Sequence, residues 1–417
     1  MEKKQYGVLS LPVIVAALGY FVDIYDLLLF SIIRIPSLKS FGLNDEAIAK
    51  DGLLIINVQM IGLLIGGIIW GVLGDKKGRL KVLYASIILY SVGNIANGFV
   101  HTIPQYALVR FITGVGLAGE LGAGITLVTE ILPKEKRGIG TSLVAGIGLT
   151  GAVFAFFLKE VFVNNPEGWR ICYFIGGGLG LVLLLLRVGV LESAMFKSIE
   201  ESSVSRGNFF MLFTNGRRLR KYILAILIGL PTWYVIGILI TFSKEFGSRM
   251  NIQGTIDPGK AVMFAYAAIS IGDVLIGFVS QGFKSRKKAL YVFYAITAIG
   301  IAWFFNLHHA TASHLYLVCA ILGFGTGFWA IFVTMAAEQF GTNIRATVAT
   351  TVPNMVRGSL TLVTLLFTGL QGSLGYLSSG WVTGMVVMVV GLLSVIFTEE
   401  TFHKDLNYLE EEVPATV

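Results

Sequence analysis

The chain has 417 residues, of which 55% are hydrophobic and only 14% are charged, whereas a soluble globular protein carries about 25% charged residues. This excess of apolar residues is too large for soluble cores, and 29 Phe and 15 Tyr exclude intrinsic disorder. The composition predicts a polytopic membrane protein. The net charge of +7 is explained by the charges of the loops and does not indicate nucleic-acid binding.

Twelve stretches are long and apolar enough to cross a bilayer, since a helical span needs about 20 mostly apolar residues. In chain order they are residues 8–34, 52–73, 80–100, 103–131, 138–163, 169–190, 220–246, 260–283, 288–307, 313–338, 345–371 and 374–398. The ten-residue alternating segments of a β-barrel are absent from the sequence. We therefore expect an all-α membrane protein of twelve transmembrane helices. Its domains would be a six-helix bundle over 1–190, a cytoplasmic linker over 191–219, a second six-helix bundle over 220–398 and a cytoplasmic tail over 399–417.

The distribution of Lys and Arg predicts the orientation in the membrane. With the N-terminus in the cytoplasm, 22 of the 32 basic residues fall on the cytoplasmic side and 8 on the outer side. We expect both termini in the cytoplasm and a multi-pass protein of the plasma membrane (bacterial-type inner membrane), functional as a monomer. Cys172 and Cys319 lie within spans and no metal-ligand spacing occurs, so neither a disulfide nor a metal or other cofactor is expected.

The first span carries two acids in the run Asp23-Ile24-Tyr25-Asp26. At 1.5 Å per residue, Asp26 lies about 12 Å below the outer surface, and Arg110 of the fourth span lies about 10 Å below it. A buried carboxylate facing an arginine at matching depth can bind and release a proton when helices move. Asp23 shares the helix face of Asp26 and would titrate with it. The alternative is a permanent salt bridge that closes the outer half.

A repeated charge spacing relates the two halves of the chain. An acid precedes an arginine by seven residues at the end of the fourth span and again at the end of the tenth, at an offset of 208 residues. Paired six-span halves are typical of secondary transporters. We expect a cytoplasmic gate of charge pairs formed by Asp75, Arg79, Glu130, Arg137, Glu338 and Arg345.

The eleventh span holds Arg357 about 18 Å above its cytoplasmic end, near the midplane. A guanidinium there needs an anion, and arginine suits a bidentate grip on a carboxylate. The alternative partner is the buried acid Asp273. Aromatic residues near helix breaks, which could stack on a planar acid, complete the predicted substrate site with Arg357: Tyr25, Trp233, Tyr234 and Trp329. The role of Glu120, in a glycine-rich part of the fourth span, stays open.

The run Gly74-Asp75-Lys76-Lys77-Gly78-Arg79-Leu80-Lys81 resembles the signature of the major facilitator superfamily. Further runs resemble the aromatic-acid:proton symporters, the metabolite:proton symporters and the animal organic anion and cation transporters. They are the first-span run with Ile24 in place of Gly, Trp169-Arg170, Leu191-Glu192-Ser193-Ala194-Met195-Phe196 with Ala194 in place of Pro, and Glu400-Thr401.

This resemblance implies the major facilitator fold and proton coupling through Asp26 and Arg110. In the animal transporters, an Arg twelve residues after the position of Arg345 accompanies anionic substrates, and here that residue is Arg357. The sequence thus predicts a proton-coupled symporter of a small organic anion, working by alternating access. Its partners would be the anion, protons and the lipid bilayer, without nucleic acid.

Two other functions are considered. A symporter of a neutral solute such as a sugar or polyol would use Arg357 only as a partner of Asp273. A membrane enzyme is disfavoured because the spans hold no nucleophile–base or metal constellation, and a sensor is disfavoured because the tail after 398 is too short for a signalling domain.

Overall fold

The computed structural model describes residues 7–77, 79–119, 128, 132, 137–195, 209–402, 404 and 410. Within these ranges the side chains of 74–77, 79–81, 137–139, 142, 188–195, 342, 343 and 346 are not described. The described chain is helical throughout, and its sole β-type pairing is an isolated bridge between Gln253 and Thr311. The all-α architecture expected from the sequence is confirmed.

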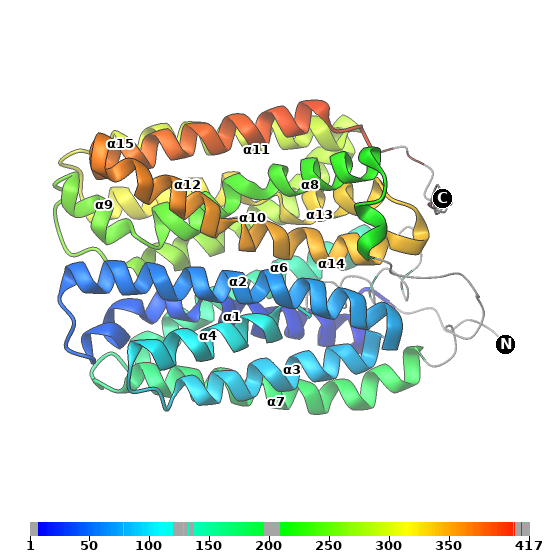
Figure 1. Cartoon of the computed structure of the whole chain (residues 1–417), viewed down its shortest axis with the longest axis horizontal. Coiled ribbons are helices and arrows are strands. Elements are labelled where there is room, and N and C mark those ends of the chain that lie inside the picture. The colour runs from blue at the N-terminus through cyan, green and yellow to red at the C-terminus, as the bar shows by residue number, and fades with distance from the viewer. Residues whose placement is uncertain are drawn as a thin grey trace.

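The first group of helices, here called the N-half, comprises α1 (Leu11–Lys39), α2 (Asp45–Lys77), α3 (Arg79–Asn97), α4 (Ile103–Leu117), α6 (Arg137–Val161) and α7 (Gly168–Met195). Helix α1 packs on α6 and α7, α2 packs on α4, and α3 packs on both α4 and α7. These helices run roughly parallel or antiparallel to one another along the long axis of the molecule (Figure 1).

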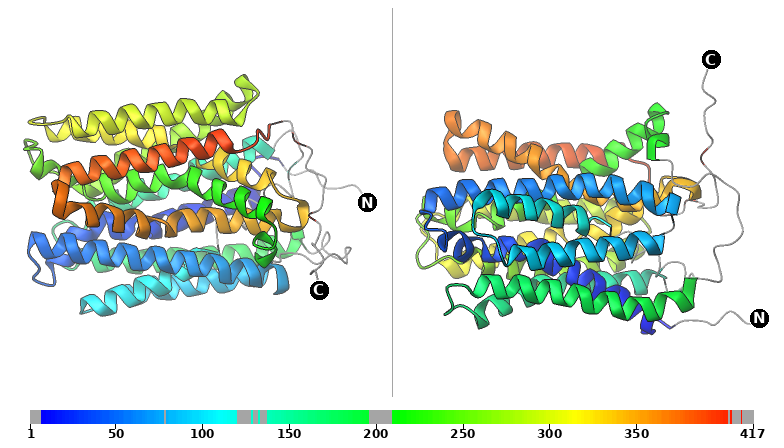
Figure 2. Two further views of the ribbon diagram at one scale, coloured as in Figure 1. Left: turned by 45° about the horizontal axis from the view of Figure 1, so that its top comes forward. Right: turned by 60° about the horizontal axis from the view of Figure 1, so that its bottom comes forward.

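The second group, the C-half, contains α8 (Gly216–Tyr234), α10 (Pro258–Phe283), α11 (Arg286–Phe305), α12 (Ala312–Thr326), α13 (Trp329–Glu338), α14 (Thr342–Gly358) and α15 (Leu360–Phe397). Three short elements, η2 (Phe209–Leu212), η3 (Val235–Ile240) and α9 (Ser243–Arg249), complete it. The two halves meet where α10 packs on α6 and α14 packs on α2. Figure 2 shows both halves as bundles whose helices run along the long axis of the molecule.

Nine helical segments of the described chain are long and apolar enough to cross a membrane. One of them, Thr347–Phe397, contains Gly375 at φ +73°, a left-handed conformation that favours glycine, and α15 is two helices joined by a kink at this residue. Val82–Asn97 is an apolar helix too short to count among them. Residues 120–127, which follow α4 in the predicted fourth span, lie outside the described residues. The number of twelve spans therefore stays a prediction.

Several helices begin at side chains that accept a backbone N–H, the interaction that polar residues make at a helix N-terminus. Thr102 begins α4, Asn215 begins α8, Asp257 begins α10, Ser285 begins α11 and Thr311 begins α12. Thr102, Asp257 and Thr311 stand just before mostly apolar runs, and Asn215 and Ser285 stand before short basic runs that lead into apolar ones, so the sequence itself marks where these helices start.

Two helices are interrupted near the middle of the molecule. After Pro231, α8 continues as the π-helix η3, in which the N–H of Thr241 donates to the carbonyl of Ile236. Between α12 and α13 the chain leaves the helix at Gly327, whose position would bring a Cβ within 2.9 Å of backbone atoms of Ile269, Gly272 and Asp273. Only glycine permits this close approach of α10, so the break delivers the N-terminus of α13 to Asp273.

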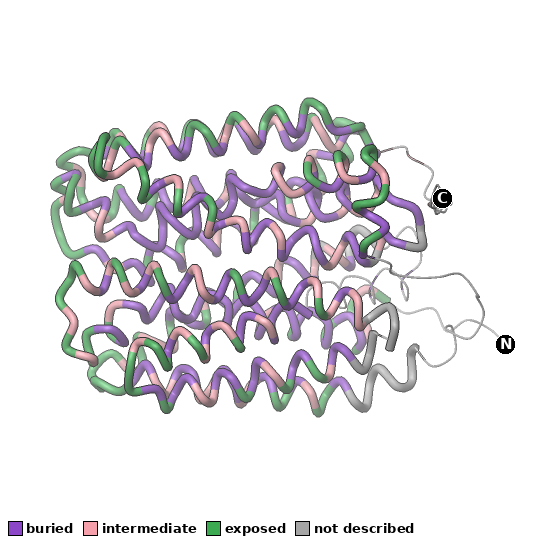
Figure 3. The backbone as a smooth tube through the Cα atoms, viewed as in Figure 1, coloured by how far each residue is buried: buried purple, intermediate pink, exposed green. Residues whose placement is uncertain are grey.

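Buried residues lie along the helix faces that point into the molecule, and exposed residues lie on the outward faces and at the helix ends (Figure 3). Large apolar side chains stand among the exposed ones, including Leu185 and Phe278. Soluble proteins rarely expose extended apolar surface, so these outward faces suit a lipid environment.

Candidate transport site

The predicted acids of α1 and Arg110 of α4 come together in the N-half. Asp26 and Arg110 are both 0% exposed, and Asp23 is also buried. The Arg110 guanidinium donates to the backbone carbonyl of Asp26 (3.0 Å) and to Asn94 Oδ1 (3.3 Å). Within the described chain, neither carboxylate oxygen of Asp26 makes a hydrogen bond of good geometry, although Arg110 and Asp23 both act on it electrostatically. The contact is thus looser than a closed ion pair.

Arg357 lies buried on α14, in the C-half. Its guanidinium carbon is 5.7 Å from the centroid of the Trp329 ring, and Nη1 donates to Asn354 Oδ1 at 3.3 Å. Among the described residues, Nε has no hydrogen-bond partner and no ion pair joins Arg357 to Asp273 or to another acid. A buried guanidinium without an acid as its partner is costly, and an anionic ligand would offset that cost.

Asp273 instead faces the N-terminus of α13. Its Oδ1 accepts the backbone N–H of Ala330 at 2.8 Å, and the backbone N–H of Trp329 also faces the carboxylate. The N-terminus of a helix favours negative charge, so the break at Gly327 provides this acid with its partner. Within the described part of the chain Oδ2 has no hydrogen-bond partner.

Two tyrosines that sequence reasoning missed connect these groups. Tyr20 of α1 interacts electrostatically with Asp23, Asp273 and Arg357, and both Tyr20 and Tyr266 of α10 lie in the field of Arg357. Both rings are buried, and across the described residues neither hydroxyl makes a hydrogen bond. A signal existed only for Tyr20, which stands three residues before Asp23 and hence on the same helix face.

Three other predicted aromatic residues occupy different places. The Tyr25 hydroxyl donates to the carbonyl of Cys172 on α7 at 2.7 Å, and the Tyr234 hydroxyl donates to the carbonyl of Gly380 on α15 at 2.6 Å. Each of these hydroxyls is thus engaged within its own half. Trp233 is buried, and its indole N–H has no hydrogen-bond partner in the described chain.

Of the predicted gate residues, Glu338 and Arg345 have described side chains. Glu338 pairs with Arg286 at 3.2 Å and accepts the Thr401 hydroxyl at 2.6 Å, both within the C-half. Arg345 donates to the carbonyl of Phe340. Glu130 and Glu120 lie outside the described residues, as do the side chains of Asp75, Arg79 and Arg137.

Glu400 holds the N-terminus of α11. It accepts the Ser285 hydroxyl and the backbone N–H groups of Arg286 (3.0 Å) and Lys287 (3.2 Å). Burial pushes the pKa of Glu400 upward, but these hydrogen bonds outweigh burial and hold its pKa below its ordinary value. The Glu400-Thr401 pair is therefore a structural tie between the end of α15 and the cytoplasmic ends expected for α11 and α13.

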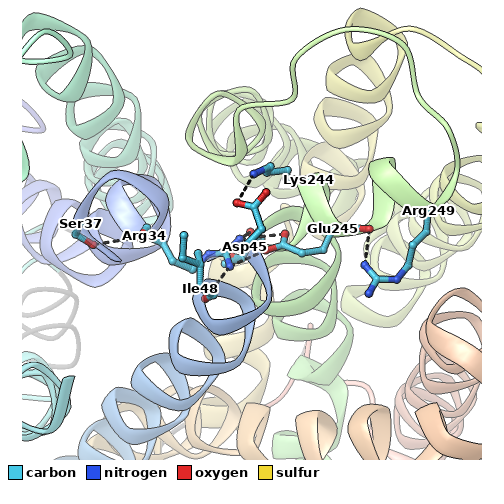
Figure 4. A network of polar contacts seen from close by, with 8 residues as sticks. Arg34, Ser37, Asp45, Ile48, Lys244, Glu245 and Arg249 are labelled. Atoms are coloured by element: carbon cyan, nitrogen blue, oxygen red, sulfur yellow. Dashed lines mark hydrogen bonds and ion pairs between the residues drawn. The ribbon is translucent and has the colours of Figure 1, made fainter. Parts of the chain in front are cut away.

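A second polar group, here called the distal cluster, joins the halves at the end of the molecule away from the termini. It consists of Arg34 of α1, Asp45 of α2, and Lys244 and Glu245 of α9 (Figure 4). Arg34 donates to both carboxylate oxygens of Glu245 (2.7 and 3.1 Å) and to the carbonyl of Thr241 (3.1 Å). Arg34 also lies 4.4 Å from the Phe242 ring centroid.

The members of the distal cluster differ in exposure. The side chains of Arg34 and Glu245 are 0% and 12% exposed, whereas those of Lys244 and Asp45, 3.0 Å apart, are 32% and 70% exposed. Nearby, Lys159 of α6 pairs with Asp257 at the start of α10. Three ion pairs thus join the N-half to the C-half at this end. The sequence did not predict these pairs, because nothing in its spacing links residues that lie 98 to 211 positions apart.

Comparison with known proteins agrees with this architecture. The family model of the Major Facilitator Superfamily matches residues 16–364. The niacin transporter NiaP of Acinetobacter baylyi is 25% identical over 370 residues, covering 80% of this chain and 80% of its own length. The cis,cis-muconate transport protein of the same organism is 25% identical over 399 residues, covering 92% and 93%.

Among solved structures, the proton:xylose symporter XylE bound to 6-bromo-6-deoxy-D-glucose superposes with a TM-score of 0.70 at 15% identity, covering 95% of this chain and 97% of the other. The likeness in structure concerns the fold. The sequence relatives confirm the predicted resemblance to transporters of aromatic and other organic acids.

Proposed function

Since the chain belongs to the Major Facilitator Superfamily, and is therefore a multi-pass membrane transporter and not an enzyme, we propose that it is a proton-coupled symporter of a small organic anion of carboxylate type. Transport would proceed by alternating access between two six-helix bundles, residues 1–190 and 220–398, with twelve spans and both termini in the cytoplasm. The linker 191–219 would connect the bundles.

The observation that carries the anion assignment is the environment of Arg357. It is a buried cation beside an indole ring, and no described acid pairs with it. A substrate carboxylate supplies the missing charge and the hydrogen-bond acceptors. The relatives named for niacin and cis,cis-muconate support the same class.

The proton would be carried by Asp26, with Asp23 as its coupled neighbour and Arg110 as the competing cation. The Arg110 guanidinium is already on the backbone carbonyl of Asp26, so a small helix movement brings it onto the carboxylate or away from it. Closing that contact favours the ionised acid and releases the proton, and opening it favours uptake. Separation of the halves at the cytoplasmic end would break charge pairs between predicted gate residues of opposite halves, whereas the pair of Glu338 with Arg286 lies within the C-half and would persist.

The proposal is tested by uptake into proteoliposomes with and without an inward proton gradient. The panel is radiolabelled benzoate, niacin, muconate and xylose. We expect accumulation of acids only with the gradient. Asp26→Asn should abolish accumulation but leave exchange of internal for external anion, while Asp45→Asn, which removes an exposed acid, should retain both. Accumulation in Asp26→Asn equal to wild type would refute the proton assignment.

A second candidate, symport of a neutral solute, is supported by the likeness in fold to the proton:xylose symporter XylE. Arg357→Ala separates the candidates, because it should lose anion binding while leaving any binding of a sugar. Arg357→Lys, which keeps the charge but not the bidentate geometry, should bind anions weakly. Uptake of xylose alone, unaffected by Arg357→Ala, would select the neutral-solute candidate.

A further inference from the structure

One buried carboxylate of the C-half has an oxygen without a hydrogen-bond partner among the described residues. Asp273 is 1% exposed, and its Oδ1 is held by the N-terminus of α13. Its Oδ2 makes no hydrogen bond within the described chain. A buried acceptor left without a donor costs about 1–3 kcal/mol, and more when charged, so such an atom indicates that a donor arrives from elsewhere.

Trp329 links this acid to Arg357. The backbone N–H of Trp329 faces the Asp273 carboxylate, while its indole ring lies beside the Arg357 guanidinium. The indole N–H and Arg357 Nε are likewise buried without hydrogen-bond partners in the described residues. The Asp273 carboxylate therefore lies at the backbone of Trp329, and the Arg357 guanidinium, with its unpartnered Nε, lies at the indole ring of the same residue.

We propose that Arg357 and Asp273 recognise the two ends of one substrate, an aromatic monocarboxylate whose ring carries a hydrogen-bond donor such as a hydroxyl or amino group. The carboxylate binds Arg357, the ring lies along Trp329, and the ring donor binds Asp273 Oδ2. This inference rests on the proposed function and deepens it, since anion transport alone requires only Arg357.

The surrounding charges favour a single carboxylate with this orientation. Asp23 and Asp273 both act on the Tyr20 hydroxyl, as does Arg357, so one cation stands among two acids. A second carboxylate on the substrate would face like charge without a partner. The free hydroxyls of Tyr20 and Tyr266, one from each half, are available to donate to the carboxylate at Arg357.

The test compares ligands whose ring oxygen can donate a hydrogen bond, as a hydroxyl, with ligands whose ring oxygen cannot, as the slightly larger methoxy group. The full chain is purified, and calorimetry measures the binding of meta- and para-hydroxybenzoate and of the corresponding methoxybenzoates. In the wild type the hydroxyl compound should bind more tightly by about tenfold to a hundredfold, the range of one hydrogen bond to a charged group. Asp273→Asn replaces the unused acceptor by an NH₂ donor while its carbonyl still accepts from Ala330, so the preference should vanish or reverse.

Three results would count against the inference. A hydroxyl preference of equal size in Asp273→Asn and wild type would reflect shape alone, and it would overturn the role of Asp273 while leaving anion transport standing. Equal binding of both compounds by the wild type would do the same. If no acid bound to a wild-type protein whose thermal melt showed that it was folded, both this inference and the proposed function would be overturned. Asp45→Asn serves as the control, since it removes an exposed carboxylate far from Arg357.

Discussion

Replacement of Glu245 by Gln tests whether the distal cluster holds the two halves together. The substitution keeps the size of the side chain and removes the charge that faces Arg34. Arg34 then remains fully buried with the carbonyls of Thr241 and Ile48 and the Phe242 ring as partners. A buried arginine without its carboxylate destabilises the closed arrangement of this end.

The magnitude follows from the exposures. Breaking a fully buried ion pair by removing one partner costs about 3–5 kcal/mol. Because Glu245 is 12% exposed and Arg34 keeps neutral acceptors, we expect about 2 kcal/mol, roughly a 30-fold change in the equilibrium. A closed form favoured by about 99 to 1 would then be favoured by only about 3 to 1.

Spin labels report the separation of the halves directly. Cysteines are introduced at two exposed positions, Ser40 after α1 and Ser248 on α9, after the buried Cys172 and Cys319 have been replaced by Ala. Pulsed electron resonance then gives the distribution of label distances. Glu245→Gln should add a longer-distance population of about one quarter, matching the ratio above.

The matched control is Asp45→Asn, which breaks the exposed pair with Lys244 in the same cluster. Exposed ion pairs contribute about 0–1 kcal/mol, so its distance distribution should stay close to that of the wild type. If Glu245→Gln and Asp45→Asn gave the same distribution, burial would not decide the strength of these contacts, and the reasoning would fail.

Two further predictions concern helix ends. Gly327→Ala places a Cβ within 2.9 Å of backbone atoms in α10, so it should lower the free energy of unfolding by about 1–3 kcal/mol and weaken substrate binding. Gly369→Ala, with open space around the added Cβ, should do neither. Equal unfolding temperatures for the two variants would contradict this prediction. Glu400→Gln should lower the unfolding temperature at neutral pH, because the folded pKa of Glu400 lies below its ordinary 4.5. The stabilisation by its ionised form is present above that ordinary value and is lost as the pH falls through the folded pKa, so the gap between wild type and variant in a pH series of thermal melts should close in acid; a gap that widens there would reverse the sign.

The sequence predicted the all-helical architecture because most helices are marked locally, by about 20 apolar residues and, in several, by a polar residue at the start. It also predicted that Asp26 would meet Arg110, since depth along a helix can be counted. That the contact is made by the backbone carbonyl of Asp26 could not be predicted, because side-chain direction depends on how α1 rotates against α4.

Residues distant in the sequence were the hardest to predict. Tyr266 reaches the field of Arg357 only through the packing of α10 against its neighbours, and the pairing of Arg34 with Glu245 depends on two halves meeting. Tyr25 and Tyr234 illustrate the opposite case. Tyr25 stands beside Asp26 in the sequence and Tyr234 beside Trp233, yet the turn of each helix directs their hydroxyls to backbone carbonyls within their own halves.

The π-helical turn η3 (Val235–Ile240) should allow this helix to lose one residue without disturbing the contacts of its two ends. A π turn arises where one residue more than the α-helix requires is accommodated without altering the phase of the flanking segments. Loss of one residue from an ordinary membrane helix rotates everything beyond it by about 100°, which misplaces every later contact. Loss of one residue between Val235 and Ile240 would restore a plain α-helix and leave Trp233 and Glu245 facing as they do now. In evolutionary terms, this is where the seventh predicted span can gain or lose a residue without changing what its two ends contact.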